Sequence, residues 1–168
     1  RQLAALGYNV LMVASGEEEL LRSAEEVRQQ SPRVWVRTWT KDLATPTAAE
    51  ELFAYTEREG IKVDVLVNNA GIFSFCDILS TPVERIERVI YLHDLTTTKT
   101  CRLYAEDMIG RGGGRILNMS SYSIWMPYPG LSLYSASKAY LKSFSVAFSK
   151  EVEEHGVTVT AVCPAGIA

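Results

Sequence analysis

Short apolar runs alternate with helix-like segments along this 168-residue chain, and this alternation constrains the fold more than any other feature. The runs at 8–14, 63–67 and 157–162 are nearly continuous in apolar residues, which is typical of strands buried on both faces of a parallel sheet. Residues 33–40 and 115–119 supply two further strand patterns. Segments with helical spacing separate these runs, at residues 17–30, 46–59, 82–108 and 134–155.

Connections of this length suit right-handed crossovers between parallel strands, so the sequence predicts an α/β fold with a doubly wound, Rossmann-like sheet. Without a linker or an internal repeat, residues 1–168 are expected to form one dinucleotide-binding domain. Residues 1–7 read as the last turns of a helix, and residues 163–168 as a strand that runs into a loop. We therefore expect the chain to be incomplete at both ends.

The composition is ordinary for a protein with a sizeable core, with 47% hydrophobic and 22% charged residues. A net charge of −3 gives no reason to expect nucleic acid or an anionic membrane as a partner. The three cysteines lie far apart and outside any metal-ligand spacing, so we expect no metal site and a reducing, cytoplasmic location. No stretch of the sequence is long and apolar enough to be a transmembrane segment.

Ligands of such a sheet bind beyond the carboxyl ends of its strands. Polar or glycine-bearing groups follow four of the predicted strands, and the helix at 134–155 begins after the third group. These candidate groups therefore converge on one edge of the sheet. They are Asp42-Leu43, residues 68–71, Ser120-Ser121 and residues 164–166.

Tyr134 and Lys138 are four residues apart, so a helix would place both on one face. A free tyrosine titrates near ~10, and ionising one near neutral pH requires roughly 4 kcal/mol. A positive charge about 4 Å away, at an effective dielectric of ~20, supplies about that much. The pair is a candidate proton donor and acceptor, although this spacing also arises by chance.

Four motifs together resemble the short-chain dehydrogenase/reductase family, in the order and spacing of that family. They are Asn-Asn-Ala-Gly at 68–71, a serine at a strand end, Tyr-x-x-x-Lys at 134–138 and Pro-x-x-Ile at 164–167. Tyr134 follows Ser121 by 13 residues, the spacing typical of the family, which favours Ser121 over Ser120. The resemblance covers nearly the whole chain.

The resemblance implies an oxidoreductase that transfers a hydride between NAD(P)(H) and a secondary alcohol or ketone. Tyr134 would be the general acid or base, Lys138 would lower the Tyr134 pKa and hold the nicotinamide ribose, and Ser121 would donate to the substrate oxygen. The substrate is expected to be a small apolar molecule, such as a 3-oxoacyl chain or a steroid. The alternatives are a non-catalytic dinucleotide-binding sensor or scaffold, an inactive remnant, and a capping role for the Ser121 hydroxyl.

The cofactor residues that the resemblance implies are Asp42, Leu43, Asn69, Ala70, Gly71, Tyr134, Lys138, Pro164, Gly166 and Ile167. The turn at 68–71 could also brace neighbouring strands, and Asp42 could cap the helix after its strand. The first strand and glycine-rich phosphate-binding turn of the family are missing from this chain. Residues 14–16 offer no carboxylate for a ribose 2′-hydroxyl and no arginine for a 2′-phosphate, so we favour NADP(H) over NAD(H).

His93 occupies the position where the family has an asparagine that orders a water near the lysine. The imidazole could replace that asparagine in a proton relay or merely pack locally, and a shift of one residue would put Asp94 there instead. Trp125, Met126 and Tyr128 could line an apolar substrate or pack on the surface. The aromatic stripe Tyr140, Phe144 and Phe148 on the helix at 134–155 is expected to be core or a subunit contact rather than a ligand site. The family's habit of packing that helix against its copy implies a homodimer or homotetramer.

Overall fold

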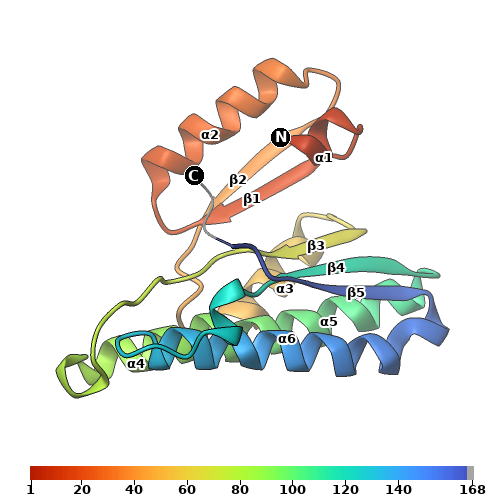
Figure 1. Cartoon of the computed structure of the whole chain (residues 1–168). Helices are drawn as coiled ribbons and strands as arrows, with labels where there is room; N and C mark the ends of the chain where they lie inside the picture. The colour runs from red at the N-terminus through yellow and green to blue at the C-terminus, as the bar shows by residue number, and fades with distance from the viewer. Residues whose placement is uncertain (166–168) are drawn as a thin grey trace. The chain divides into compact units, whose positions relative to one another are not determined.

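The structure, a computed structural model, describes residues 1–165 and divides the chain into two compact units, Arg1–Leu43 and Ala44–Ala168 (Figure 1). In the first unit, two parallel strands pair with Val10 opposite Val36 and Ala14 opposite Thr40. The elements of this unit are α1 (Gln2–Ala5), β1 (Val10–Ala14), α2 (Glu17–Gln30) and β2 (Val36–Thr40).

Helix α2 covers one face of this strand pair because its apolar residues recur at helical spacing. Ala24 and Val27 are buried against Val36 of β2, with Ala4 of α1 in the same cluster. Arg28, in the last turn of α2, donates from Nη2 to the Val36 carbonyl at 2.8 Å. The short unit therefore has a small apolar core of its own.

In the second unit, three parallel strands lie in the order β3-β4-β5. Leu66 pairs with Ile116, and Ile116 pairs with Val159, so these buried side chains share one register across the sheet. The helices and strands of this unit are α3 (Ala48–Arg58), β3 (Val65–Asn68), α4 (Val83–Ile90), α5 (Thr97–Gly110), β4 (Gly114–Met119), α6 (Ser132–Val152) and β5 (Val157–Val162).

Helices α5 and α6 lie side by side along one face of this sheet, and α3 packs against α5 (Figure 1). Met108 of α5, Ile116 of β4 and Val157 of β5 are at most 1% exposed and form the centre of this layer. The turn between α5 and β4 is close-packed, because the Gly113 backbone approaches Gly156, with φ at +134°. The stacked layers place the carboxyl ends of β3 and β4 beside the start of α6.

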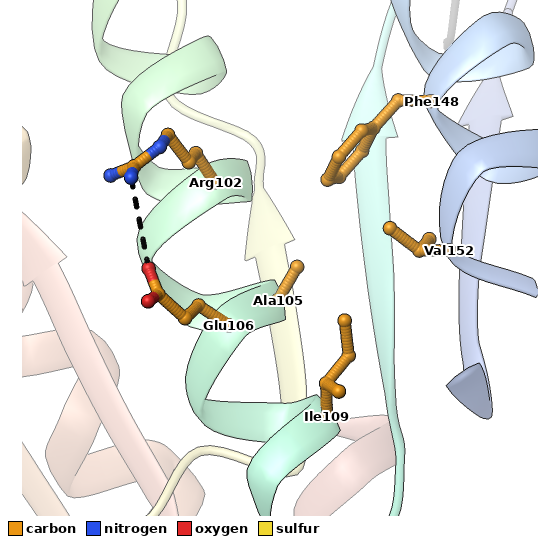
Figure 2. Close-up of a pocket in the computed structure, with 6 residues that line it drawn as sticks. All are labelled: Arg102, Ala105, Glu106, Ile109, Phe148 and Val152. Atoms are coloured by element: carbon orange, nitrogen blue, oxygen red, sulfur yellow. Dashed lines mark ion pairs between the residues drawn. The ribbon is translucent and has the colours of Figure 1, made fainter.

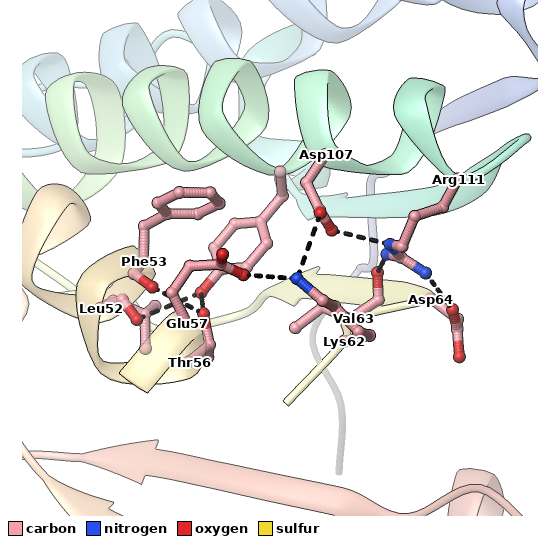
Figure 3. A network of polar contacts seen from close by, with 10 residues as sticks. Leu52, Phe53, Thr56, Glu57, Lys62, Val63, Asp64, Asp107 and Arg111 are labelled. Carbon is pink, nitrogen blue, oxygen red and sulfur yellow. Dashed lines mark hydrogen bonds and ion pairs between the residues drawn. The ribbon is translucent and has the colours of Figure 1, made fainter. Parts of the chain in front are cut away.

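A polar network at the C-terminal end of α5 contacts the residues that lead into β3 (Figure 3). Arg111 donates to Asp107 at 2.9 Å, to Asp64 at 2.7 Å and to the Val63 carbonyl at 2.6 Å. Lys62 pairs with Asp107 at 3.7 Å and with Glu57 of α3 at 2.8 Å. The guanidinium therefore joins the end of α5 to the residues that lead into β3.

Two amide side chains, one buried and one half-buried, brace the strands at the other end of the sheet. Asn68 of β3 donates from Nδ2 to Asn118 Oδ1 at 2.8 Å, and Asn118 donates to Ser145 Oγ of α6 at 2.9 Å. Thr100 of α5 donates to Asn68 Oδ1 at 3.1 Å. Each amide is satisfied by the others, as buried polar groups require. This arrangement supports the bracing role considered for the first residue of the 68–71 turn.

The structure confirms the predicted α/β fold with parallel strands and covering helices. The segment 82–108 is helical throughout, but its residues Tyr91–Thr96 form a π-helical segment between α4 and α5. The strand expected at 33–40 begins only at Val36, and the helix expected at 46–59 begins at Ala48. The single domain over 1–168 stays a prediction. Among the described residues, none of the helices is long and apolar enough to cross a membrane.

Candidate active site

The first turns of α6 bring Tyr134 and Lys138 to the end of β4. Lys138 is 4% exposed, and its Nζ donates to the Met119 carbonyl at 2.8 Å. The Lys138 carbonyl in turn accepts from Ser120 Oγ at 2.6 Å. Lys138 Nζ lies 5.8 Å from the centre of the Tyr134 ring. The predicted pair therefore lies on one helical face. Both the side chain and the backbone carbonyl of Lys138 are hydrogen-bonded to residues at the end of β4.

Burial sets the protonation of Lys138. It lowers the pKa of the Lys138 ammonium to about 8, and the nearby Asp94 carboxylate opposes this change. Burial also raises the pKa of Asp94 to about 6, and here Lys138 opposes the change. Asp94 Oδ1 is buried without a hydrogen-bond partner among the described residues. At neutral pH the site therefore holds an ammonium and a carboxylate, both largely withdrawn from water.

His93 lies in the π-helical segment and is fully buried. Its Nε2 accepts from the Ile72 backbone N–H at 2.9 Å, and its Nδ1 lies 2.8 Å from Ser137 Oγ of α6. Burial, with a smaller contribution from Lys138, lowers the pKa of His93 to about 3. A π-helical turn inside an α-helix is frequent at functional sites. This one aims an imidazole between the turn after β3 and the start of α6.

The turn after β3 contacts the same groups. Asn69, Ala70 and Gly71 are exposed, and the Gly71 backbone approaches both His93 and Lys138. A Cβ on Gly71 would lie 3.2 Å from His93 Nε2 and 3.4 Å from Lys138 Nζ. A side chain here would crowd His93 Nε2 and would touch Lys138 Nζ at ordinary contact distance. The predicted turn and the predicted lysine are therefore neighbours.

The hydroxyl groups of the two serines at the end of β4 make different hydrogen bonds. Ser120 is buried and uses its hydroxyl hydrogen on the Lys138 carbonyl. Ser121 is only partly buried, and its Oγ accepts from the Ser123 N–H at 3.1 Å, which caps the 3₁₀ turn Tyr122–Trp125. A hydroxyl that accepts one bond still has a hydrogen to donate. Ser121 can therefore cap the 3₁₀ turn and also donate a hydrogen bond to a ligand, whereas the Ser120 hydroxyl hydrogen is already used.

Apolar side chains adjoin Tyr134. The Phe73 ring meets the Tyr134 ring edge-on at 5.1 Å and is 65% exposed, and Arg85 holds the Phe73 carbonyl at 2.9 Å. Cys76 N–H donates to the Gly130 carbonyl at 2.8 Å, which joins the loop after β3 to the loop before α6. The second loop exposes the residues predicted as a substrate wall: Trp125, Met126 and Tyr128.

Sequence reasoning did not find Phe73 or Ser137. Ser137 follows Tyr134 by three residues, so it lies on nearly the same helical face, and this spacing could have revealed it. Phe73 follows the 68–71 turn by two positions, but only the folded loop shows that its ring meets Tyr134.

The other predicted cofactor residues belong to two further segments of the chain, one after β2 and one after β5. Asp42 and Leu43 follow β2 at the end of the first unit, and their cofactor role stays a prediction. The Pro164 carbonyl accepts from the Tyr122 N–H at 2.9 Å, next to the strand end that carries Ser121. Gly166 and Ile167 lie outside the described residues.

The residues present fit a ligand that carries several hydroxyl groups. Lys138 Nζ uses one of its three hydrogens on Met119, so further donors are left for ribose-type hydroxyls. Tyr134 lies in the first turn of α6, and Ser121 follows the end of β4. Chemically, the arrangement can exchange a proton with a carbonyl or hydroxyl oxygen while an ammonium stabilises the charge.

Comparisons with known proteins agree with this chemistry. The family model described as short chain dehydrogenase matches residues 1–168. This chain is 32% identical to a very-long-chain 3-oxoacyl-CoA reductase of Pyrenophora tritici-repentis over 163 residues, which are 95% of this chain and 48% of the relative. The chain spans about half the length of the curated relatives it matches.

Two solved structures are also similar. The bulky-bulky ketone specific alcohol dehydrogenase from Comamonas testosteroni has a TM-score of 0.91 at 26% identity, over 98% of this chain and 65% of that one. A short-chain dehydrogenase from Sphingobium yanoikuyae in complex with NADPH has a TM-score of 0.91 at 29% identity, over 99% of this chain and 64% of that one.

Proposed function

Because the chain belongs to the short-chain dehydrogenase family, we propose that it provides the catalytic residues of an NADP(H)-dependent oxidoreductase acting on secondary alcohols and ketones. The observation that carries this proposal is the convergence of Tyr134, Lys138 and Gly71. The Gly71 backbone approaches the lysine ammonium, which is itself beside the Tyr134 ring. This juxtaposition of a proton donor, a cation and an open backbone turn suits proton transfer to a substrate oxygen beside a bound cofactor.

Each residue has a defined task in the proposed reaction. In the reductive direction Tyr134 donates its phenolic proton to the oxygen of the ketone, and in the oxidative direction it accepts the proton of the alcohol. Lys138 stabilises the anionic phenol by its charge and offers its remaining hydrogens to the ribose of the cofactor. Ser121 donates a hydrogen bond to the same substrate oxygen, which stabilises developing negative charge there. The nicotinamide cofactor, when bound, supplies or accepts the hydride.

We favour NADP(H) over NAD(H) as the cofactor. Ala14, Ser15 and Gly16 at the end of β1 carry no carboxylate that would repel a 2′-phosphate. The similar Sphingobium protein is described as a complex with NADPH, which supports this choice. Direct titration of NADPH and NADH, followed by the nicotinamide fluorescence, tests it: equal affinities would refute the preference.

The substrate we propose is apolar, of the 3-oxoacyl or bulky-ketone kind. The exposed ring of Phe73 beside Tyr134, together with the Trp125, Met126 and Tyr128 loop, offers apolar surface next to the proton donor. Two relatives described above carry matching names, a very-long-chain 3-oxoacyl-CoA reductase and a ketone-specific alcohol dehydrogenase. An apolar substrate gains by removing this surface from water.

The deciding experiment uses the purified full-length protein with NADPH and a panel of ketones that includes 3-oxoacyl thioesters, steroids and short polar ketones. Oxidation of NADPH is followed at an absorbance of ~340 nm, the wavelength at which reduced nicotinamide reports hydride transfer. We expect turnover with apolar ketones that Tyr134→Phe abolishes. Binding of NADPH without turnover of any ketone would favour a dinucleotide sensor, and turnover that survives Tyr134→Phe would refute the assigned mechanism.

We also propose that the protein forms a homodimer or homotetramer through α5 and α6. An open, mainly apolar pocket lies between these helices; Ala105, Ile109, Phe148 and Val152 face one another across it, while Arg102 and Glu106 form an ion pair at one side (Figure 2). Phe144 and Phe148 stack at 5.3 Å beside it. The lining residues are Arg102, Ala105, Glu106, Ile109, Phe148 and Val152. Sedimentation of Phe148→Glu tests this proposal: we expect monomers, and an unchanged oligomer would refute it.

A cytoplasmic, reducing location is the last part of the proposal. Cys76, Cys101 and Cys163 are all free thiols in the structure, at exposed, buried and intermediate positions. Fractionation of the source cells tests this location, and recovery in an oxidising compartment would refute it.

A further inference from the structure

The hydrogen bonds of His93 determine its protonation state. Ile72 N–H is a backbone amide and can only donate, so Nε2 must accept with its lone pair at 2.9 Å. A ring nitrogen that accepts carries no hydrogen, and the imidazole is therefore neutral with its hydrogen on Nδ1. That Nδ1–H donates to Ser137 Oγ at 2.8 Å. The Ser137 hydroxyl then donates its own hydrogen to the Tyr134 carbonyl at 2.9 Å.

The chain of donors therefore runs in one direction, from the turn after β3 into the first turns of α6. Every hydrogen in it is assigned, and both nitrogens of His93 are occupied. The imidazole is fully buried, so water has no direct access to it. An excess proton on Nε2 would confront the Ile72 N–H, which makes the imidazolium unsuitable in this position.

The charged groups around His93 agree with a neutral ring. Lys138 of α6 lies near the same position of Gly71 as His93 and would repel an imidazolium, and its effect on the His93 pKa has that sign. Asp94, the next residue of the π-helical segment, would attract a positive charge, but burial and Lys138 lower the His93 pKa. Tyr134 meets the imidazole edge-on, with the ring centres 6.0 Å apart.

From this geometry we propose that His93 is a neutral positioning residue that clamps the turn after β3 to the start of α6. The proposal rests on the proposed function, since the elements it joins are the turn with Gly71 and the helix with Tyr134 and Lys138. In this role His93 passes no proton. It fixes the distance between the proton donor and the backbone turn that faces it.

Two readouts test the clamp without any turnover. In protein with ¹⁵N-labelled histidines, His93 should show the Nδ1–H neutral tautomer, unchanged between pH ~5 and ~8. The Ile72 amide should exchange slowly with solvent and faster in His93→Phe. His155→Gln, which alters the exposed histidine after α6, is the matched control and should leave Ile72 exchange unchanged. A Nε2–H tautomer, or titration of His93 in this pH range, would overturn the proposal.

Kinetics then separate a clamp from a proton relay. We expect His93→Phe to lower kcat about 100-fold, as small misplacements of reacting groups do, while the pH limbs of kcat stay in place. His93→Gln keeps an acceptor for Ile72, and His93→Asn keeps a donor for Ser137, so each should retain more activity than His93→Phe. Loss of a pH limb in all three variants would indicate a relay and refute the clamp.

Full kcat in His93→Phe would also refute the clamp. If the wild-type protein turns over no ketone, the proposed function fails, but the tautomer and the Ile72 exchange still decide whether His93 is a clamp. Should His93→Phe fail to fold, the comparison of His93→Gln with wild type provides the same exchange and kinetic test.

Discussion

Replacing Lys138 by methionine should stabilise the fold at neutral pH while removing activity. Burial lowers the pKa of Lys138 from 10.5 to about 8. At about 1.36 kcal/mol for each pH unit, this shift corresponds to about 3 kcal/mol of destabilisation by the buried charge. Methionine is of similar length and apolar, but it leaves the Met119 carbonyl without its donor, which costs about 1 kcal/mol. The net gain expected at pH ~7 is therefore about 2 kcal/mol.

The sign of the pH dependence follows from proton binding. Between pH 8 and 10.5 the unfolded chain holds the Lys138 proton and the folded protein has released it, so the stability of the wild type rises with pH. The gain from Lys138→Met should therefore be largest below pH ~8 and should shrink or reverse by pH ~10.

Urea denaturation of both proteins at pH ~7 and pH ~10 measures this difference. Lys142→Met is the control, because Lys142 lies one turn along α6 and its Nζ is 5.0 Å from the Trp125 ring centre. Its loss should change the free energy of unfolding by less than about 1 kcal/mol. If Lys138→Met destabilises the protein equally at both pH values, the ammonium is not the destabilising group and the reasoning is wrong.

Three further substitutions follow from close contacts. Gly71→Ala should lower kcat about 10-fold with unchanged circular dichroism, because its Cβ would lie 3.2 Å from His93 Nε2 and displace the imidazole; full activity would contradict the tight contact. Gly113→Ala should cost at least about 1–3 kcal/mol in urea denaturation and more than Gly112→Ala, since only Gly113 meets backbone, at 2.5 Å from the Gly156 carbonyl oxygen. Phe73→Ala should raise KM for apolar ketones more than for short polar ones, and an equal rise would exclude Phe73 from the substrate wall.

The elements were largely predictable because local pattern and tertiary structure agree in them. The bounds of α2 and β5 coincide with the segments expected from acidic first-turn residues, apolar spacing and the terminating glycine. Tyr134 and Lys138 were found because a four-residue spacing on a helix is a local property. Their environment was not local: the burial of Lys138 depends on packing against the end of β4.

Other features of the site could not be predicted from the sequence because they arise only on folding. Periodicity indicated a helix over 82–108, but no local signal marks the π-helical turn inside it. The two alternatives for the asparagine position, His93 and Asp94, are adjacent in that turn, and the structure puts both near Lys138. The cofactor roles of Asp42, Leu43 and Asn69 stay predictions.

The π-helical segment Tyr91–Thr96 also constrains the number of residues in the helix that runs from α4 into α5. A π-helical turn contains about one residue more than an α-helical turn, and each residue of an α-helix advances the side-chain direction by about 100°. Deleting a single residue here would convert the π-helical turn to a regular α-helical turn, so α4 and α5 could keep their buried faces while His93 would be displaced from Ile72 and Ser137. The length of this helix is therefore fixed to the residue, and insertions or deletions in it should be far less tolerated than substitutions.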